Sequence, residues 1–422
     1  MAEYFKLTDS IYDITEKYPA LIDLLAAEGF PLLKNPALRQ VMGRTITFEN
    51  ALRSKQLNVD LLAQKLREAI RQQQAEPGAG LSCGLTGPKP QRPDGPRLEG
   101  VLPCPIRIPL LDQLETWLGQ QPAGSPVHHL TYQLQAASLG LDKIIQDVRT
   151  SQGNPDQLAD LYLSAGFELF FDHELMGQYC DRGAFGDLSQ RRRLNPDLQN
   201  ARIDLQDPLG QYAILGVVPA VFMVNTKVLG QRPFPQTWAD LLRPEFEHSV
   251  ALPTRDLDLF NALLLHIHRF YGAEGVTRLG RAAQQALHPA QMVKGSGQKA
   301  AAGLPAVSVT PYFFTRMIGG NSPLQPVWPQ DGAIVSPIFM LAKASAQPQL
   351  QPLVDFFCSR QVGETFSANG KFPSTHPEVD NQLQPEQDFM WLGWDYIHQQ
   401  DITRLIRQTE RLFYAAQGKD SL

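Results

Sequence analysis

The feature of this sequence that most restricts its fold is an alternation, beyond Gly100, of short apolar runs with stretches of helical periodicity. The runs, such as VVPAVFMVN at residues 217–225, have the length of buried strands, and most are followed by a helical pattern. Strands joined by helical crossovers are typical of α/β folds, so we expect largely parallel sheets. Because roughly 300 residues exceed one comfortable core, we expect two lobes.

Composition divides the 422 residues into three parts. Residues 1–75 are helical in pattern and predict a small helical bundle, with Asp9 or Ser10 capping its first helix. Residues 76–100 are rich in Pro and Gly and predict a linker. Residues 101–422 are the predicted bilobal domain, with lobe 1 at about 101–215 and 333–422 and lobe 2 at about 216–332. The apolar stripe of the first helices consists of Ile11, Ile14, Tyr18, Leu21, Leu24 and Leu25.

Charge and hydropathy exclude two classes of partner. The formal net charge is −5, from 38 basic and 43 acidic residues, which gives no reason to expect nucleic acid or an anionic membrane surface as a partner. The longest apolar run, Ala213 to Val224, is shorter than the roughly 20 residues of a membrane helix and contains Pro219. We therefore expect it to be a buried strand and predict no membrane insertion.

The amino-terminal residues and the cysteines bear on location. The start, MAEYFKLTDSIYD, carries acidic residues and no apolar core of a secretory signal, which favours a cytoplasmic protein, or a periplasmic one if a leader is missing from the sequence. The cysteines are scattered without a C-x-x-C pair, so neither a zinc site nor a disulfide framework is predicted, and no cofactor is expected. They are Cys83, Cys104, Cys180 and Cys358.

Motifs for catalysis are missing from the sequence. It has no G-x-S-x-G elbow, no G-x-x-x-x-G-K-[ST] phosphate loop, and no H-E-x-x-H zinc motif. We therefore predict a protein without enzymatic activity. The alternative is a thiol-dependent enzyme in which Cys104, at a strand-to-helix turn, is the nucleophile and His173 its base.

Several polar residues follow predicted strands, where ligands bind in open α/β sheets. The segment VKGSGQKAAAG offers a Gly-rich turn and a helix start whose amides suit an anion, although a plain helix cap explains it equally well. Arg107 offers a bidentate charge for an oxyanion, or else is a surface arginine. We expect a small, anionic solute between the lobes. The predicted ligand-binding residues are Cys104, Arg107, Asp172, His173, Ser296, Gly297 and Tyr312.

Seven segments resemble the type II periplasmic-binding-protein fold, in the branch that binds ferric iron, thiamine and phosphonates for ABC transporters. They are LPCPIRIPL, GFELFFDHELM, VNTK, PQTWADLLRPEFEHSVALP, VKGSGQKAAAG, PYFFTRM and GAIVSPIFMLAK, and the resemblance runs from about Val101 to Asn381. It implies two α/β lobes joined by crossing strands that close on a solute without chemistry.

The segment PYFF resembles the position where iron binders of that branch carry two neighbouring tyrosines that coordinate the metal. Tyr312 matches one of them, but Phe313 replaces the other and cannot coordinate, so ferric binding is not expected. We hypothesise that Tyr312 instead gives its hydroxyl to an oxygen of the ligand. The alternative is a core tyrosine bonded to backbone.

The amino-terminal unit is similar to a short helical domain of unknown function, which occurs alone or ahead of hybrid-cluster and iron-sulfur-repair proteins. Many members carry paired cysteines after a Gly-Phe, whereas Pro31, Leu32 and Leu33 follow Gly29-Phe30 here. The resemblance therefore implies a docking or dimerising module that binds a protein partner. A further alternative for the whole chain is an interaction or regulatory protein whose cleft is vestigial.

Overall fold

The computed structural model describes residues 5–18, 21–22, 25, 30, 33, 39, 46–54, 66, 95–122, 124–136, 141–254, 257–286, 304–318 and 322–418. Contacts within the chain divide it into two units, Met1–Gln91 and Arg92–Leu422.

The amino-terminal unit contains two described helices, α1 (Ile11–Lys17) and α4 (Phe48–Ser54). The Ser10 hydroxyl caps α1 by accepting a hydrogen bond from the Asp13 N–H at 3.0 Å, so Ser10 is the cap between the two predicted candidates. The rings of Phe5 and Phe48 meet edge to face, with their centroids 5.3 Å apart. Ile11, Ile14, Tyr18, Leu21 and Leu25 of the predicted stripe are buried, whereas Leu24 lies outside the described residues.

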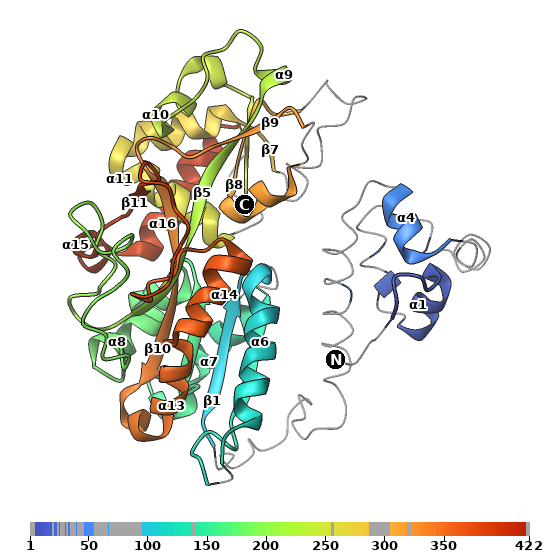
Figure 1. The fold of residues 1–422 in the computed structure, drawn as a ribbon. Coiled ribbons are helices and arrows are strands. Elements are labelled where there is room, and N and C mark those ends of the chain that lie inside the picture. Colours follow the sequence, from blue (N-terminus) through green and yellow to red (C-terminus); the bar gives the residue numbers. More distant parts are fainter. Residues whose placement is uncertain are drawn as a thin grey trace. The chain divides into compact units, whose positions relative to one another are not determined.

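The strands in the described part of the second unit form one mixed sheet, so the predicted α/β fold is confirmed. Its order is β2-β1-β3-β10-β5-β8-β6-β7, with β4 and β11 pairing with β10 and β9 pairing with β5 (Figure 1). The strands are β1 (Arg97–Leu102), β2 (Thr131–Ala136), β3 (Leu161–Ala165), β4 (Phe185–Gly186), β5 (Ala213–Asn225), β6 (Val250–Leu252), β7 (Ala283–Ala286), β8 (Val307–Pro311), β9 (Leu324–Val327), β10 (Ala333–Lys343) and β11 (Phe389–Met390).

Two long strands cross the middle of this sheet. β5 and β10 run antiparallel to each other, and every residue of both is buried. On one side of the pair, β2, β1 and β3 are parallel to one another; on the other side β7, β6 and β8 are parallel. The sheet is therefore parallel toward its two ends, as expected, but antiparallel at its centre, because β5 and β10 join the two parallel sets.

The strand β1 begins inside the stretch for which composition predicts a linker. Gly100 contributes to that Pro/Gly-rich composition, yet it lies within β1, at a place where β3 passes very close. A Cβ atom at Gly100 would lie 1.9 Å from the carbonyl oxygen of Leu163, so a larger residue cannot occupy the position. The glycine is required by strand packing, not by chain flexibility.

Helices cover both faces of the sheet (Figure 1). One face of the β1–β3–β10 region is covered by α6, α13 and α14, whose apolar side chains form one core with those strands. The regular helices of this unit are α6 (Cys104–Gly119), α7 (Asp142–Thr150), α8 (Gln178–Asp181), α9 (Thr226–Leu229), α10 (Trp238–Leu241), α11 (Leu257–Ala282), α13 (Gln347–Phe357), α14 (Arg360–Gly370), α15 (Trp394–Gln399) and α16 (Ile402–Ala415). Short turns of other helix types are η3 (Pro155–Gln157), η4 (Leu169–Phe171), η5 (His173–Gly177), η6 (Pro244–Phe246), η7 (Tyr312–Met317) and η8 (Ala344–Ala346).

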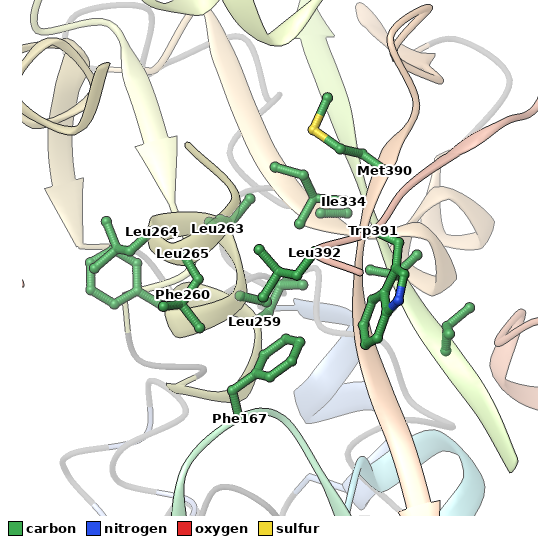
Figure 2. Close-up of a cluster of buried hydrophobic side chains, with 14 of the residues drawn as sticks. Phe167, Leu259, Phe260, Leu263, Leu264, Leu265, Ile334, Met390, Trp391 and Leu392 are labelled. Atoms are coloured by element: carbon green, nitrogen blue, oxygen red, sulfur yellow. The ribbon is translucent and has the colours of Figure 1, made fainter. Parts of the chain in front are cut away.

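The opposite face carries a second, larger core that includes side chains of α11. Figure 2 shows Leu259 and Leu263 of α11 near Leu392, which follows β11. The carboxyl-terminal helix α16 packs on α11, where the rings of Phe260 and Phe413 lie 5.1 Å apart. The sequence assigned this tail to lobe 1, but its packing partner α11 belongs to the stretch assigned to lobe 2.

A buried histidine in this core makes stability depend on pH. His266 is fully buried in α11, and burial lowers the pKa of its imidazole to about 4. The unfolded chain therefore binds more protons than the folded chain between about pH 6.5 and pH 4, and stability falls as pH falls through that window. We expect a loss of about 3 kcal/mol from this group at pH 4. Denaturant titrations of wild type and His266→Leu at a series of pH values measure it.

The matched control is His128→Leu, because the His128 side chain is exposed. His128→Leu should keep the wild-type dependence on pH, whereas His266→Leu should flatten it. Equal slopes in wild type and His266→Leu would contradict the prediction.

Candidate functional site

One edge of β5 changes its hydrogen-bonding partner near the middle of the strand. On the edge away from β10, residues 373–375 bond β5 at Leu215 and Val217, with both N–H···O distances 3.0 Å. Farther along, β8 pairs with β5 from Ala220 onward. Because hydrogen bonds alternate between the two edges of an antiparallel strand, the N–H of residue 219 would point into the gap between the two partners. Pro219 has no N–H, so no donor of β5 is left unpaired there. We call this place the switch point of β5.

Tyr312 and Lys371 flank the switch point. Tyr312 follows the last residue of β8, and Lys371 precedes the segment 373–375. The Lys371 Nζ lies 4.5 Å from the centroid of the Tyr312 ring and donates to the Thr315 Oγ1 at 3.3 Å. The ring of Trp328 meets Tyr312 edge to face at 5.1 Å. An ammonium, a phenol and a threonine hydroxyl therefore gather where β5 exchanges partners.

The turn η7 sets the direction of these side chains. It begins after Pro311, whose φ of −54° suits a helix start, and the Thr315 hydroxyl donates to the Tyr312 carbonyl at 2.8 Å. The Arg316 Nη1 donates to the Ala368 carbonyl of α14 at 2.9 Å, which joins η7 to the end of that helix. Phe313 packs against the core beneath α6 and α14. The second aromatic of PYFF is therefore a packing residue.

Close packing fixes the path of the chain after Lys371. A Cβ atom on Gly216 would lie 2.9 Å from the Pro373 carbonyl oxygen and 3.0 Å from a ring carbon of Phe366. Glycine at this position lets residues 373–375 lie directly against β5. That contact holds the residues just before it, including Lys371, beside the switch point.

Cys104 and Arg107 lie at the start of α6. Cys104 is the first residue of the helix, directly after β1 and Pro103. Arg107 is only 2% exposed, and its Nη1 donates to the Leu134 carbonyl of β2 at 3.1 Å. The structure thus gives this guanidinium a backbone partner inside the domain.

Asp172 and His173 contact groups on η5 and α8. The Asp172 carboxylate caps η5 by accepting from the Glu174 N–H at 2.9 Å. The His173 Nδ1 lies 3.3 Å from the Asp181 carboxylate, and both side chains are about half exposed. None of these contacts includes Tyr312. Of the other predicted residues, Ser296 and Gly297 lie outside the described part of the chain.

Two polar residues at strand or helix ends were not among the predicted ligand-binding residues. Lys371 follows the helix pattern ending in Asn369-Gly370, a usual helix stop, which was the available signal. Glu168 follows β3, and its Oε1 accepts from the Asn261 Nδ2 at 2.8 Å. Burial raises the pKa of Glu168, and the Glu410 carboxylate raises it further.

A small cavity lies elsewhere, beside the start of β5. It is lined by residues that include Arg191, Asp207, Tyr212 and Cys358, and its free volume is about 10 Å³. That volume holds about one water molecule and is too small for a solute.

Two family models match the chain. One, described as a domain of unknown function (DUF1858), covers residues 5–62, and the other, described as bacterial extracellular solute-binding protein, covers residues 156–400. No curated protein sequence matches significantly. Within the described ranges, every helix is too short or too polar to cross a lipid bilayer.

Solved structures of periplasmic binding proteins share the fold. The apo ferric ion-binding protein A of Pasteurella haemolytica is 12% identical, with a TM-score of 0.54 over 78% of this chain and 99% of that one. The periplasmic binding protein AfuA of Actinobacillus pleuropneumoniae, with bound fructose-6-phosphate, is 14% identical, with a TM-score of 0.51 over 77% and 98%. An ABC-transporter substrate-binding protein of Agrobacterium tumefaciens is 13% identical, with a TM-score of 0.51 over 77% and 96%.

These matches agree with the type II periplasmic-binding-protein fold and with the helical domain that the sequence resembles. The solute-binding model covers more than half of the chain and includes β3, β5, β8 and β10. The chain belongs to the bacterial extracellular solute-binding protein family.

Proposed function

We propose that this protein binds a small, anionic solute at the switch point of β5 and leaves it chemically unchanged. The observation that carries the proposal is the pairing of Tyr312 with Lys371, whose Nζ lies 4.5 Å from the ring centroid. Ligands of open α/β sheets bind outside the carboxyl ends of the strands, and Tyr312 directly follows the carboxyl end of β8. Relatives in fold include one with bound fructose-6-phosphate and one that serves an ABC transporter, so a transported anion is a fitting solute.

An anion fits this site better than the ferric ion that some relatives bind. Phe313 stands where a second tyrosine would be needed, and it packs against the core instead. An ammonium next to Tyr312 also repels a metal cation and attracts an oxyanion.

The proposal includes two lobes that close on the solute, lobe 1 at about 101–215 and 333–422 and lobe 2 at about 216–332. Its support is that η7, from the second stretch, contacts α14, from the first, through Arg316 and Thr315. A solute that binds the closed form more tightly than the open form shifts the population toward closure.

Replacement of Tyr312 by phenylalanine tests the proposed site. The ring and its contact with Trp328 remain, but the hydroxyl that would donate to the ligand is lost. We expect affinity for the anion to fall about 10-fold or more, since hydrogen bonds to charged groups contribute about 1.5–3 kcal/mol. Isothermal titration calorimetry with phosphates, phosphonates, thiamine phosphates and ferric complexes measures the change.

Tyr132→Phe is the control, because Tyr132 is an exposed tyrosine on β2. It should bind as wild type does. If no compound of the panel binds wild type, or if Tyr312→Phe binds as tightly as Tyr132→Phe, the proposed site is wrong.

A cytoplasmic location is part of the proposal. Its support is that Cys180 and Cys358 are free thiols, which suit a reducing compartment. Fractionation of the producing cells, followed by detection of the chain, tests it. Recovery from the periplasm would overturn the location and leave the binding site untouched.

The helical amino-terminal unit is proposed to dock a protein partner. Its support is a compact apolar core of its own, which includes Phe5, Ile14, Phe48 and Leu52. A unit with its own core can present a surface without taking part in solute binding. Solute affinity should therefore be the same for the full chain and for a chain lacking residues 1–91.

A further inference from the structure

We infer that Lys371 is the residue that selects the solute, by binding an oxygen anion such as a phosphate ester or a carboxylate. The inference rests on the proposed function, because it assigns a ligand class to that same site. The side chain of Lys371 extends from the end of α14 to Tyr312 and Thr315 of η7.

The hydrogen bonds of the Lys371 ammonium leave room for a ligand. A lysine ammonium has three N–H donors, and the Thr315 hydroxyl at 3.3 Å accepts one of them. The Tyr312 ring provides a π face at 4.5 Å, not a negative charge. Among the described residues, no carboxylate pairs with Lys371, whereas Lys343 pairs with Asp160 at 2.7 Å. A half-buried ammonium without a counterion attracts an anion.

The backbone of Lys371 has a conformation that is unfavourable for residues other than glycine. Lys371 ends α14 with φ 47° and ψ 39°, in the left-handed region that glycine usually fills at helix ends. A side chain at such a position carries a steric cost that glycine avoids. Residues held in this way often belong to binding sites, and this one directs its ammonium to Tyr312 and Thr315.

An oxyanion bound there would contact both flanks of the switch point. Two N–H donors of Lys371 and the Tyr312 hydroxyl can each bond an anion oxygen, and one flank comes from the end of α14 and the other from η7. A charge-assisted hydrogen bond from an ammonium is about twice as strong as a neutral one. Phosphate esters and carboxylates both supply such oxygens, and the experiment separates them.

The test measures binding and thermal stability of the full chain in four forms: wild type, Lys371→Met, Lys371→Arg and Lys371→Gly. The probes are inorganic phosphate, fructose 6-phosphate, citrate and thiamine, of which thiamine is the cationic control. We expect Lys371→Met to bind the best anionic probe about 10- to 100-fold more weakly, and Lys371→Arg to stay within about 5-fold of wild type. Phosphate or fructose 6-phosphate as the best probe indicates a phosphate ligand, and citrate indicates a carboxylate.

Lys371→Gly separates a binding role from a purely structural one. Glycine relieves the left-handed backbone, so we expect the Tm without ligand to rise by about 1–3 °C while anion affinity is lost. A lysine that only fastens η7 to α14 would give a lower Tm in this variant. That result, together with unchanged anion affinity, would overturn the inference.

The outcomes distinguish the inference from the proposed function. If Tyr312→Phe weakens binding but Lys371→Met binds within about 2-fold of wild type, the assignment of Lys371 is wrong and the switch-point site stands. Binding of thiamine alone overturns both the assignment of Lys371 and the anionic solute class of the proposed function. Absence of binding by every probe overturns both.

Discussion

Replacement of Trp238 by alanine is expected to destabilise the second unit by about 3–5 kcal/mol. The indole is fully buried and meets the Phe222 ring of β5 edge to face at 4.8 Å. Its Nε1 donates to the Gly332 carbonyl at 2.9 Å, and its backbone N–H donates to the Asp331 carboxylate at 3.0 Å. Truncation to alanine leaves a large cavity and an unpaired carbonyl just before β10. Denaturant titration followed by far-UV circular dichroism measures the change.

Two further variants divide this effect into its parts. Trp238→Phe keeps a ring against β5 but removes the donor to Gly332, so it should lose about 1–3 kcal/mol. Phe270→Ala removes an aromatic side chain that is 47% exposed, and we expect a loss of less than about 1 kcal/mol. A Trp238→Ala protein as stable as Phe270→Ala would contradict the prediction.

Replacement of Lys343 by methionine should destabilise the second unit by about 3 kcal/mol. The Lys343 side chain is 3% exposed, and its Nζ donates to the Asp160 carboxylate at 2.7 Å and to the Leu158 carbonyl at 3.1 Å. Methionine fills the space but leaves Asp160 without its cation, and the Leu158 carbonyl keeps only the Arg97 guanidinium as a side-chain donor. The remaining described bond to that carboxylate comes from the Arg97 N–H at 3.0 Å. Chemical denaturation of the two proteins measures the difference.

The control for this prediction is Lys143→Met. Lys143 pairs with Glu99 at 3.6 Å, but its side chain is 45% exposed, and surface pairs contribute about 0–1 kcal/mol. The double variant Lys343→Met with Asp160→Asn should recover part of the lost stability, because it removes the uncompensated charge. An effect of Lys343→Met no larger than that of Lys143→Met would show that the buried pair does not stabilise the fold.

The fold was largely predictable because its main signals are local. The apolar runs that became β5, β8 and β10 are visible in any window of the sequence, and so are the helical patterns between them. The helix cap at Ser10 and the capping box of Thr237 and Asp240 likewise depend on only a few neighbouring residues. The family resemblance that these segments carry agrees with the solute-binding match.

The candidate site was only partly predictable. Tyr312 was among the predicted ligand-binding residues because it follows a strand. Lys371 comes from the end of a helix far along the chain and meets Tyr312 only because β5 pairs with the segments next to both. Arg107 has chemistry that suits an anion, and tertiary contacts place its Nη1 against the Leu134 carbonyl of β2. A residue type indicates what a side chain is able to bind, and the direction in which it points depends on distant segments.

The sequence alone indicated the α/β class and the apolar runs that form β5, β8 and β10, because hydrophobic periodicity and turn residues act over a few neighbouring positions. The type of protein followed from the resemblance to a known family. Only the tertiary structure decided that β5 and β10 run antiparallel through the centre of the sheet, that Gly100 lies within a strand, and that Lys371 stands beside Tyr312. These features depend on contacts between segments widely separated in the chain. Such contacts form only when many apolar surfaces are buried together, and no local pattern records which distant surface each one meets.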